Sequence, residues 1–219
     1  MNLSPRTFVL LSMLGLLLGL SGCASLPETA ESSTPPSTEG ALDRDAQRLD
    51  LWLARQHAMQ QLNNWRCEGR AAILTQDGGG QISFDWLRTP NDQILSIKTP
   101  LGQNALQLTI NPSGATLIDH EGQVTQGEDG EAMLNQALGW SVPIESLRAW
   151  LLGLPATGDD SYTLDAQGRI LTLNSQGWSI EYKRYSETNG PGLSMSLPSK
   201  FELRRSEITL RLVIDRWTF

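Results

Sequence analysis

The sequence has 219 residues, of which 39% are hydrophobic, and a formal net charge of −7 at pH 7. This length is enough for one domain with a sizeable hydrophobic core, and the acidic balance argues against a nucleic-acid-binding protein, whose surface would be basic. Two histidines and two cysteines, at no spacing known for zinc ligands, predict neither a metal site nor a cofactor.

A short N-terminal leader precedes Cys23. Its one charge, Arg6, is followed by 13 mostly apolar residues, 8–20. This order is typical of a secretory signal peptide, here residues 1–22, and the run is shorter than the roughly 20 residues of a membrane-spanning helix. The segment Leu20-Ser21-Gly22-Cys23 resembles the lipobox of bacterial lipoproteins, which implies that Cys23 becomes the acylated first residue of the mature protein. An ordinary cleaved leader with a chance cysteine is the alternative.

The residues after Cys23 bear on where such an anchor would lie. Ala24 and Ser25 follow it, and by resemblance to other lipoproteins the absence of aspartate there implies the periplasmic face of the outer membrane. Residues 23–40 contain mainly Pro, Ser, Thr and Glu, which predicts a disordered tether that reaches about 55 Å at most. The remaining residues, 41–219, are predicted to form a single domain.

The first part of that domain is predicted to be helical and the next part β. Residues 42–62 place Leu49, Trp52, Leu53 and Met59 near helical spacing, with His57 as a solvated helix residue. From Trp65 the hydrophobic period changes to two. Strands are expected at residues 65–74, 81–88, 94–99, 105–110 and 115–119, with a shorter one after Gly122 and a hairpin turn at 77–80.

Two short helices interrupt the β pattern. Residues 129–138 form the first and are predicted to end at Gly139 as a C-cap; the second starts at Pro143 and is unusually apolar for its length. Further strands are expected at 161–165, 169–173, 178–184, 200–204 and 207–219, with a loose segment at 186–196. A curved antiparallel sheet with a helical layer can enclose a cavity when its closure is incomplete.

The sequence contains no recognisable catalytic motif. Neither a Gly-x-Ser-x-Gly nucleophile turn nor a Ser-x-x-Lys motif is present, so we expect a protein that is not an enzyme. Cys67 falls within an alternating strand pattern and is interpreted as a small buried hydrophobe, with a reactive thiol as the alternative. What the chain has instead is an excess of apolar strand faces and seven tryptophans, which fit either a packed core or a lined cavity.

Several segments together resemble the LolB family of outer-membrane receptors for lipoproteins. Besides the lipobox, they are Trp65-Arg66-Cys67-Glu68-Gly69-Arg70, Phe84-Asp85-Trp86, Thr99-Pro100-Leu101-Gly102, Gly139-Trp140-Ser141-Val142-Pro143, Leu147-Arg148-Ala149-Trp150-Leu151-Leu152-Gly153-Leu154-Pro155, Gly177-Trp178 with Tyr182, Leu197-Pro198 and Asp215-Arg216-Trp217. The segment from Leu147 to Pro155 is the most diagnostic. The long Pro/Ser/Thr tether is the main departure from the family pattern.

The resemblance implies a mainly β fold with α: an incomplete antiparallel β-barrel of about ten to eleven strands with a helical lid, as in LolA and LolB. It further implies a monomer that takes client lipoproteins from the periplasmic carrier LolA, holds their acyl chains in an apolar cavity and inserts them into outer-membrane lipid. The matching position for a membrane-insertion leucine on a protruding loop is Leu101. The residues expected to line the cavity are Trp86, Leu147, Trp150, Leu151 and Trp178. The rival interpretation is a structural envelope lipoprotein with a filled core that acts as an assembly scaffold.

Overall fold

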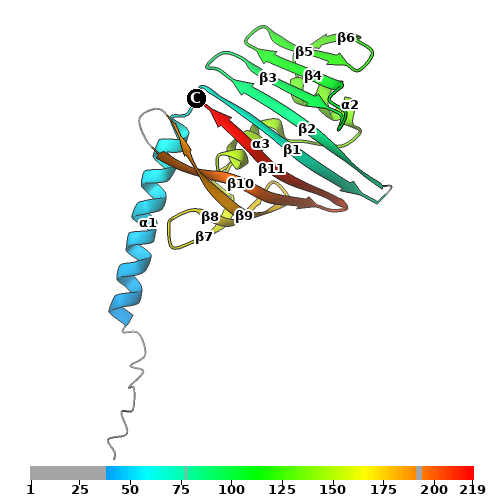
Figure 1. Cartoon of the computed structure of the whole chain (residues 1–219). Coiled ribbons are helices and arrows are strands. Elements are labelled where there is room, and N and C mark those ends of the chain that lie inside the picture. Colours follow the sequence, from blue (N-terminus) through cyan, green and yellow to red (C-terminus); the bar gives the residue numbers. More distant parts are fainter. Residues whose placement is uncertain (1–37, 77, 191–193) are drawn as a thin grey trace, which may run out of the picture. The chain divides into compact units, whose positions relative to one another are not determined.

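The computed structural model describes residues 38–219, apart from 77 and 191–193 (Figure 1). The predicted signal peptide, the lipobox with Cys23 and residues 24–37 of the predicted tether therefore lie outside the described residues. Residues 38–40 of that tether belong to the first helix, α1, which spans Thr38–Gln60. The tether was predicted to extend to residue 40 because the start of α1 shows no apolar periodicity. Residues 41–47 of α1 are exposed, and Arg44 Nε donates to the Gly40 carbonyl, at 2.7 Å.

In the described part of the chain, eleven strands and two further helices follow α1. The strands are β1 Trp65–Thr75, β2 Gly78–Arg88, β3 Gln93–Lys98, β4 Asn104–Asn111, β5 Gly114–Asp119, β6 Val124–Gly127, β7 Ser161–Leu164, β8 Ile170–Ser175, β9 Trp178–Asn189, β10 Ser194–Arg205 and β11 Ile208–Thr218. The helices α2 Gly130–Leu138 and α3 Ile144–Leu151 lie between β6 and β7 in the sequence. None of the described helices is long and apolar enough to cross a bilayer.

All eleven strands form one antiparallel sheet in the order β6-β5-β4-β3-β2-β1-β11-β10-β9-β8-β7. Successive hairpins build each half, and pairing of β1 with β11 joins the halves at the centre. The edge strands of the sheet are β6 and β7. Each of them pairs with only one of the described strands, so the sheet does not close on itself. The predicted mainly β fold, with an incomplete antiparallel barrel and a helical layer, is confirmed.

Two local predictions were wrong. Gly78, Gly79 and Gly80 do not form the turn; they begin β2 and pair with residues 73–75 of β1, since a backbone without side chains can still complete a hydrogen-bonded ladder. The segment 186–196 is mostly strand, with Leu197 of β10 paired to Ser186 of β9. Pro198 lies there at a register shift, where a strand tolerates a residue without an N–H.

The packing follows from the alternation of side chains along the strands. On β2, Phe84 and Trp86 are buried on one face, whereas Asp85 between them points to the other. Helices α2 and α3 lie against the face that carries the apolar side chains (Figure 1). Helix α1 is held to the β7 region through Trp52, whose indole Nε1 donates to the Tyr162 hydroxyl at 3.0 Å.

Candidate functional site

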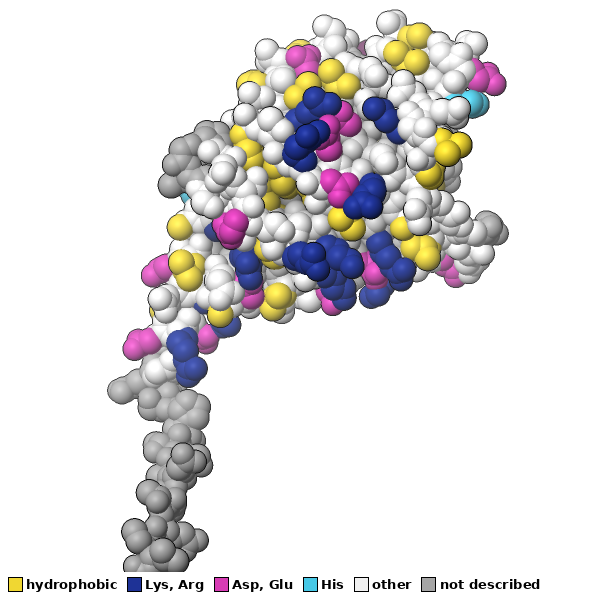
Figure 2. All heavy atoms as spheres, viewed as in Figure 1, with side chains coloured by type: hydrophobic (Ala, Val, Ile, Leu, Met, Phe, Trp, Pro, Cys, Tyr) yellow, Lys and Arg dark blue, Asp and Glu magenta, His cyan; other side chains and the backbone are white. Residues whose placement is uncertain are grey.

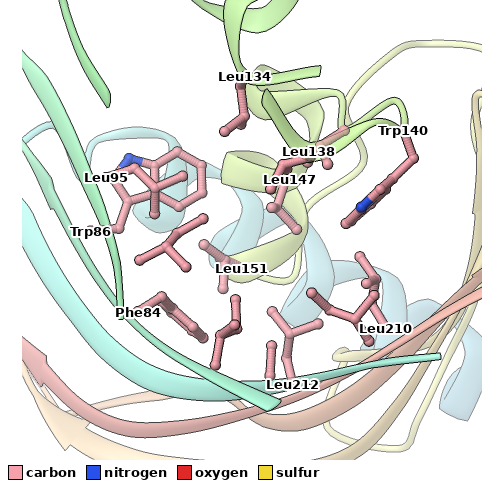
Figure 3. A pocket seen from close by; sticks show the side chains of 15 residues that line it. Phe84, Trp86, Leu95, Leu134, Leu138, Trp140, Leu147, Leu151, Leu210 and Leu212 are labelled. Carbon is pink, nitrogen blue, oxygen red and sulfur yellow. The ribbon is translucent and has the colours of Figure 1, made fainter. Parts of the chain in front are cut away.

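An apolar cavity of about 80 Å³ lies between the inner face of the sheet and the segment that contains α2 and α3 (Figure 3). The sheet contributes Ala71, Ile73, Ile82, Phe84, Trp86, Leu95, Ile97, Leu210 and Leu212, and the helical segment contributes Leu134, Leu138, Trp140, Val142, Leu147 and Leu151. Every lining side chain is aliphatic or aromatic. Cavities of this composition stay dry and accept apolar ligands, because a water molecule inside would lack hydrogen-bond partners.

The strand register explains why the sheet side of the cavity is continuous. Phe84 pairs with Ile97, and Trp86 pairs with Leu95, across β2 and β3. In the other direction, Ala71 of β1 has Leu212 of β11 as its partner. Paired residues project to the same face of a sheet, so inward positions on four neighbouring strands form one surface.

The helical side of the cavity is held together by side chains of α2. The first backbone amide of α3 has no side-chain cap from Pro143, the N-cap residue. Instead, Glu131 Oε2 accepts a hydrogen bond from the Ile144 N–H at 2.9 Å, and Asn135 Oδ1 accepts one from the Val142 N–H at 2.6 Å. The bond from Ile144 satisfies a donor that a helix start leaves free, and both bonds tie α2 to the start of α3 as one layer.

The helical layer is also tied to the sheet by hydrogen bonds, one of which is the buried bond from the Tyr182 hydroxyl on β9 to the Trp150 carbonyl on α3, at 2.8 Å. The Gln93 side chain on β3 donates through Nε2 to Glu145 Oε1 on α3, at 2.7 Å. Apart from such ties, contact between layer and sheet is made by the apolar side chains around the cavity. A displacement of the helical layer from the sheet would therefore widen the cavity at the cost mainly of apolar contacts.

Three of the five predicted lining residues are in the cavity wall: Trp86, Leu147 and Leu151. Leu147 and Leu151 are one helical turn apart on α3 and face the cavity together (Figure 3). Trp150 and Trp178 are not part of this wall. Trp150 is fully buried on another side of α3, with its ring centroid 6.2 Å from that of Trp178, and its carbonyl accepts a hydrogen bond from the Tyr182 hydroxyl.

This correction has a simple geometric reason. Successive residues turn by about 100° around an α-helix, so Trp150 is rotated away from the side that Leu147 and Leu151 share. Trp178 begins β9, and neither β9 nor the adjacent β10 contributes a residue to the cavity wall. The two tryptophans belong to the packed core, and the apolar character of α3 in the sequence could not separate its two buried sides.

Most of the other residues in the cavity wall were not predicted from the sequence. Leu210 and Leu212 alternate with polar residues along β11, but only the pairing of β11 with β1 brings them to the cavity. Trp140 follows the α2 C-cap, Gly139, whose φ of 76° confirms the predicted helix end. Its position in a loop gave no periodic signal, although an aromatic residue directly after a helix end could have been noticed.

Leu101 lies at the tip of the β3–β4 hairpin with 88% of its surface exposed. The turn is closed by the Gly102 N–H, which donates to the Thr99 carbonyl at 2.9 Å, and by the Thr99 N–H, which donates to the Gln103 carbonyl at 2.9 Å. Gly102 has φ of 80°, a backbone conformation that favours glycine. The leucine is thus held outward on a short, hydrogen-bonded turn.

The cysteine and the two histidines considered as functional groups in the sequence lie outside the cavity wall. Cys67 is completely buried, and burial raises the pKa of its thiol well above the ordinary value. His57 and His120 are both exposed. Within residues 38–219, leaving aside 77 and 191–193, no group of three His, Cys, Asp or Glu side chains could hold a metal ion.

Comparison with known proteins places the chain in a family. It is 35% identical over 214 residues to the outer-membrane lipoprotein LolB of Pseudomonas paraeruginosa, with 97% of this chain and 95% of that protein covered. It is 29% identical to LolB of Vibrio campbellii, with 97% of each covered. Among solved structures, a LolA superfamily protein from Nitrosomonas europaea has a TM-score of 0.45 at 10% identity, over 78% of this chain and 93% of that one. Residues 63–217 match the family described as Outer membrane lipoprotein LolB, and the chain therefore belongs to the LolB family.

Proposed function

We propose that the protein is a lipid-anchored receptor on the periplasmic face of the outer membrane. It accepts lipoproteins from the carrier LolA, holds their acyl chains in the cavity and releases them into the membrane. Membership of a family named for outer-membrane lipoproteins supports the location. The observation that carries the activity is the cavity wall, in which fifteen apolar side chains from two layers face one space.

The size of the cavity defines what acyl binding requires. A volume of about 80 Å³ is smaller than the roughly 300–1,000 Å³ of ordinary ligand sites, so the cavity must widen to admit acyl chains. Six wall residues belong to the helical segment and nine to the sheet, so separation of the two layers enlarges the space without breaking the strand ladder. Each acyl methylene buried contributes about 0.8 kcal/mol, and this gain opposes the cost of separating the layers.

Delivery is assigned to the Leu101 turn. An exposed leucine gains about 1.5–3 kcal/mol when it enters an apolar phase, which orients a protein at a membrane but does not anchor it. Anchoring is the role we propose for acylated Cys23, since stable attachment needs more than one acyl chain or a second signal. Transfer then proceeds downhill, from carrier to cavity to bilayer, with each tenfold preference worth about 1.4 kcal/mol.

A second candidate is a structural envelope lipoprotein with a filled core that serves as an assembly scaffold. The small cavity volume favours this candidate, because a nearly filled space needs no ligand. The two candidates differ in whether the wall residues touch an acyl chain. They can therefore be separated by a contact measurement at the wall.

The contact measurement uses the two tryptophans in the wall, Trp86 and Trp140. Brominated acyl chains quench tryptophan fluorescence on contact. A lipopeptide that carries them should therefore quench the tryptophan fluorescence of the protein that starts at residue 24. Trp86→Phe with Trp140→Phe should remove most of the quenching, whereas the matched control Trp178→Phe should keep it. Binding without any loss of quenching in the double variant would place the acyl chains elsewhere, and no binding at all would favour the scaffold.

A further inference from the structure

The outward face of the central strands β3, β2, β1, β11 and β10 is basic, although the chain as a whole is acidic (Figure 2). Its outward-facing basic side chains are Arg66, Arg70, Lys98, Lys200, Arg204, Arg211 and Arg216, and its acidic ones are Asp85, Glu68, Asp215 and Glu202. These residues give the face a formal charge of +3, against −7 for the whole sequence. A local charge of opposite sign to the whole protein selects which partners this face attracts.

The acidic side chains of this face are already engaged by its arginines. Asp85 pairs with Arg66, and Asp215 accepts two hydrogen bonds from Arg70, at 2.8 and 2.9 Å. Glu68 pairs with Arg216, and Glu202 lies between Arg204 and Arg211. Among the described residues, neither Lys98 nor Lys200 forms an ion pair, so these two lysines carry most of the charge excess.

The strand register brings the two lysines to one level of the sheet. Lys98 pairs with Ser83, Ser83 with Arg70, Arg70 with Val213 and Val213 with Lys200, which forms one row across five strands. Along this row is a hollow of about 400 Å³, whose polar wall residues are Arg70, Gln81, Ser83, Lys200 and Arg211 and whose other wall residues are Ala71, Ala72, Ile82, Pro100 and Val213. Lys98 lies in the same row, outside this wall. The hollow thus combines cationic groups with neutral hydrogen-bond donors, the combination that binds phosphate oxygens.

The hollow also adjoins the Leu101 turn. Pro100 is part of its wall, and the next residue is Leu101, with 88% of its surface exposed. An apolar side chain that enters the acyl boundary, beside cations that attract anionic headgroups, is the arrangement of interfacial membrane-binding surfaces. An acidic protein partner would explain the cations but not the neighbouring exposed leucine.

We propose that this hollow, which includes Lys200, and Lys98 in the same row of the sheet together bind the phosphate groups of anionic phospholipids at the bilayer surface. The headgroups would orient the body so that the Leu101 turn faces the membrane. The inference rests on the proposed function in one respect: the proposed lipid anchor brings the protein to the membrane that the hollow would bind. It assigns a role to the outward face of the sheet, away from the acyl cavity.

The test is sedimentation of the chain that starts at residue 24 with vesicles of phosphatidylcholine, alone or with about 30% phosphatidylglycerol. No client lipoprotein or carrier is present, so failure of acyl binding cannot affect the result. Each Lys or Arg near an anionic surface raises binding by about fivefold. Lys98→Gln with Lys200→Gln should therefore lower binding to the anionic vesicles by about 25-fold and leave the weaker binding to neutral vesicles unchanged.

The matched control is Arg44→Gln with Arg48→Gln, which removes the same charge from α1, outside the hollow and its row of residues. It should change binding by less than a few-fold. An equal loss in the control would mean that total charge, and not this hollow, determines binding. Wild-type binding that is no stronger to anionic than to neutral vesicles, or unchanged binding of the lysine variant, would overturn the proposal.

Discussion

The most discriminating substitution is Ala71→Leu, which fills the cavity from its floor. Ala71 is 8% exposed, lies in the cavity wall and sits between its strand partners Ile82 and Leu212. The change adds three carbon atoms in the direction of the empty space. It leaves the charge, the strand ladder and the helical layer unchanged.

Stability and ligand binding should respond differently. An empty cavity destabilises a protein by about 24 cal/mol per Å³, so complete filling of about 80 Å³ would stabilise the fold by at most about 2 kcal/mol. Overpacking opposes this gain by about 1–3 kcal/mol, which leaves a small net change in the free energy of unfolding. Acyl binding loses about 0.8 kcal/mol for each of three displaced methylenes, or about 2.4 kcal/mol and roughly 50-fold in affinity.

The assay pairs urea unfolding with titration of a triacylated lipopeptide. Ala72→Leu is the control, since it makes the same change at the next residue of β1, on the opposite face of the sheet. It should bind the lipopeptide like the wild type. If folded Ala71→Leu protein also binds with wild-type affinity, the space beside Ala71 does not hold acyl chains and the reasoning from the cavity fails.

Three further predictions concern Leu101, Leu147 and Cys67. Leu101→Glu should leave the unfolding midpoint and acceptance from the carrier unchanged but slow release into vesicles several-fold, since an exposed leucine contributes little to the fold; unfolding of the variant would refute this. Leu147→Glu should lower lipopeptide affinity at least tenfold, because it places a carboxylate in the apolar wall, whereas Leu53→Glu on the exposed side of α1 should not. Cys67 should resist alkylation by a maleimide at about pH 8 until the protein unfolds in urea, because burial raises the pKa of the thiol and blocks access; rapid labelling of native protein would contradict its position in the core.

Much of the fold could be predicted because its strands are half-buried. Alternation such as that around Phe84 and Trp86 marks both a strand and its inward face. The predicted helix starting at Pro143 was also correct, because its apolar density and the proline at its start agree. The failures lie where local signals conflict with the sheet: the glycines at 78–80 indicate a turn, but continued pairing with β1 keeps them in the ladder.

The candidate site was less predictable than the fold. Leu147 and Leu151 could be selected from helical spacing, but Trp150 on the same helix satisfies the same hydrophobic criterion and faces elsewhere. The contribution of Leu210 and Leu212 depends on a strand pair that joins the two ends of the folded chain. A local stretch of sequence carries no information about that pairing, so this part of the cavity floor could not be predicted from it.

The basic outward face illustrates the same limit. Lys98 and Lys200 are about a hundred residues apart in the sequence, where each is an ordinary strand lysine in an acidic chain. Only the register across five strands places them in one row with Arg70.

The most direct measurement of the proposed receptor function is transfer of a lipoprotein from its loaded carrier. Purified LolA carrying a radiolabelled, triacylated lipoprotein is mixed with the chain that starts at residue 24, without membranes, and the two proteins are separated by size or affinity tag. We predict that most of the label moves to the chain without any nucleotide, and that Ala71→Leu retains less of it than Ala72→Leu. Label that stays on the carrier while both proteins remain folded would contradict a receptor function and favour the scaffold.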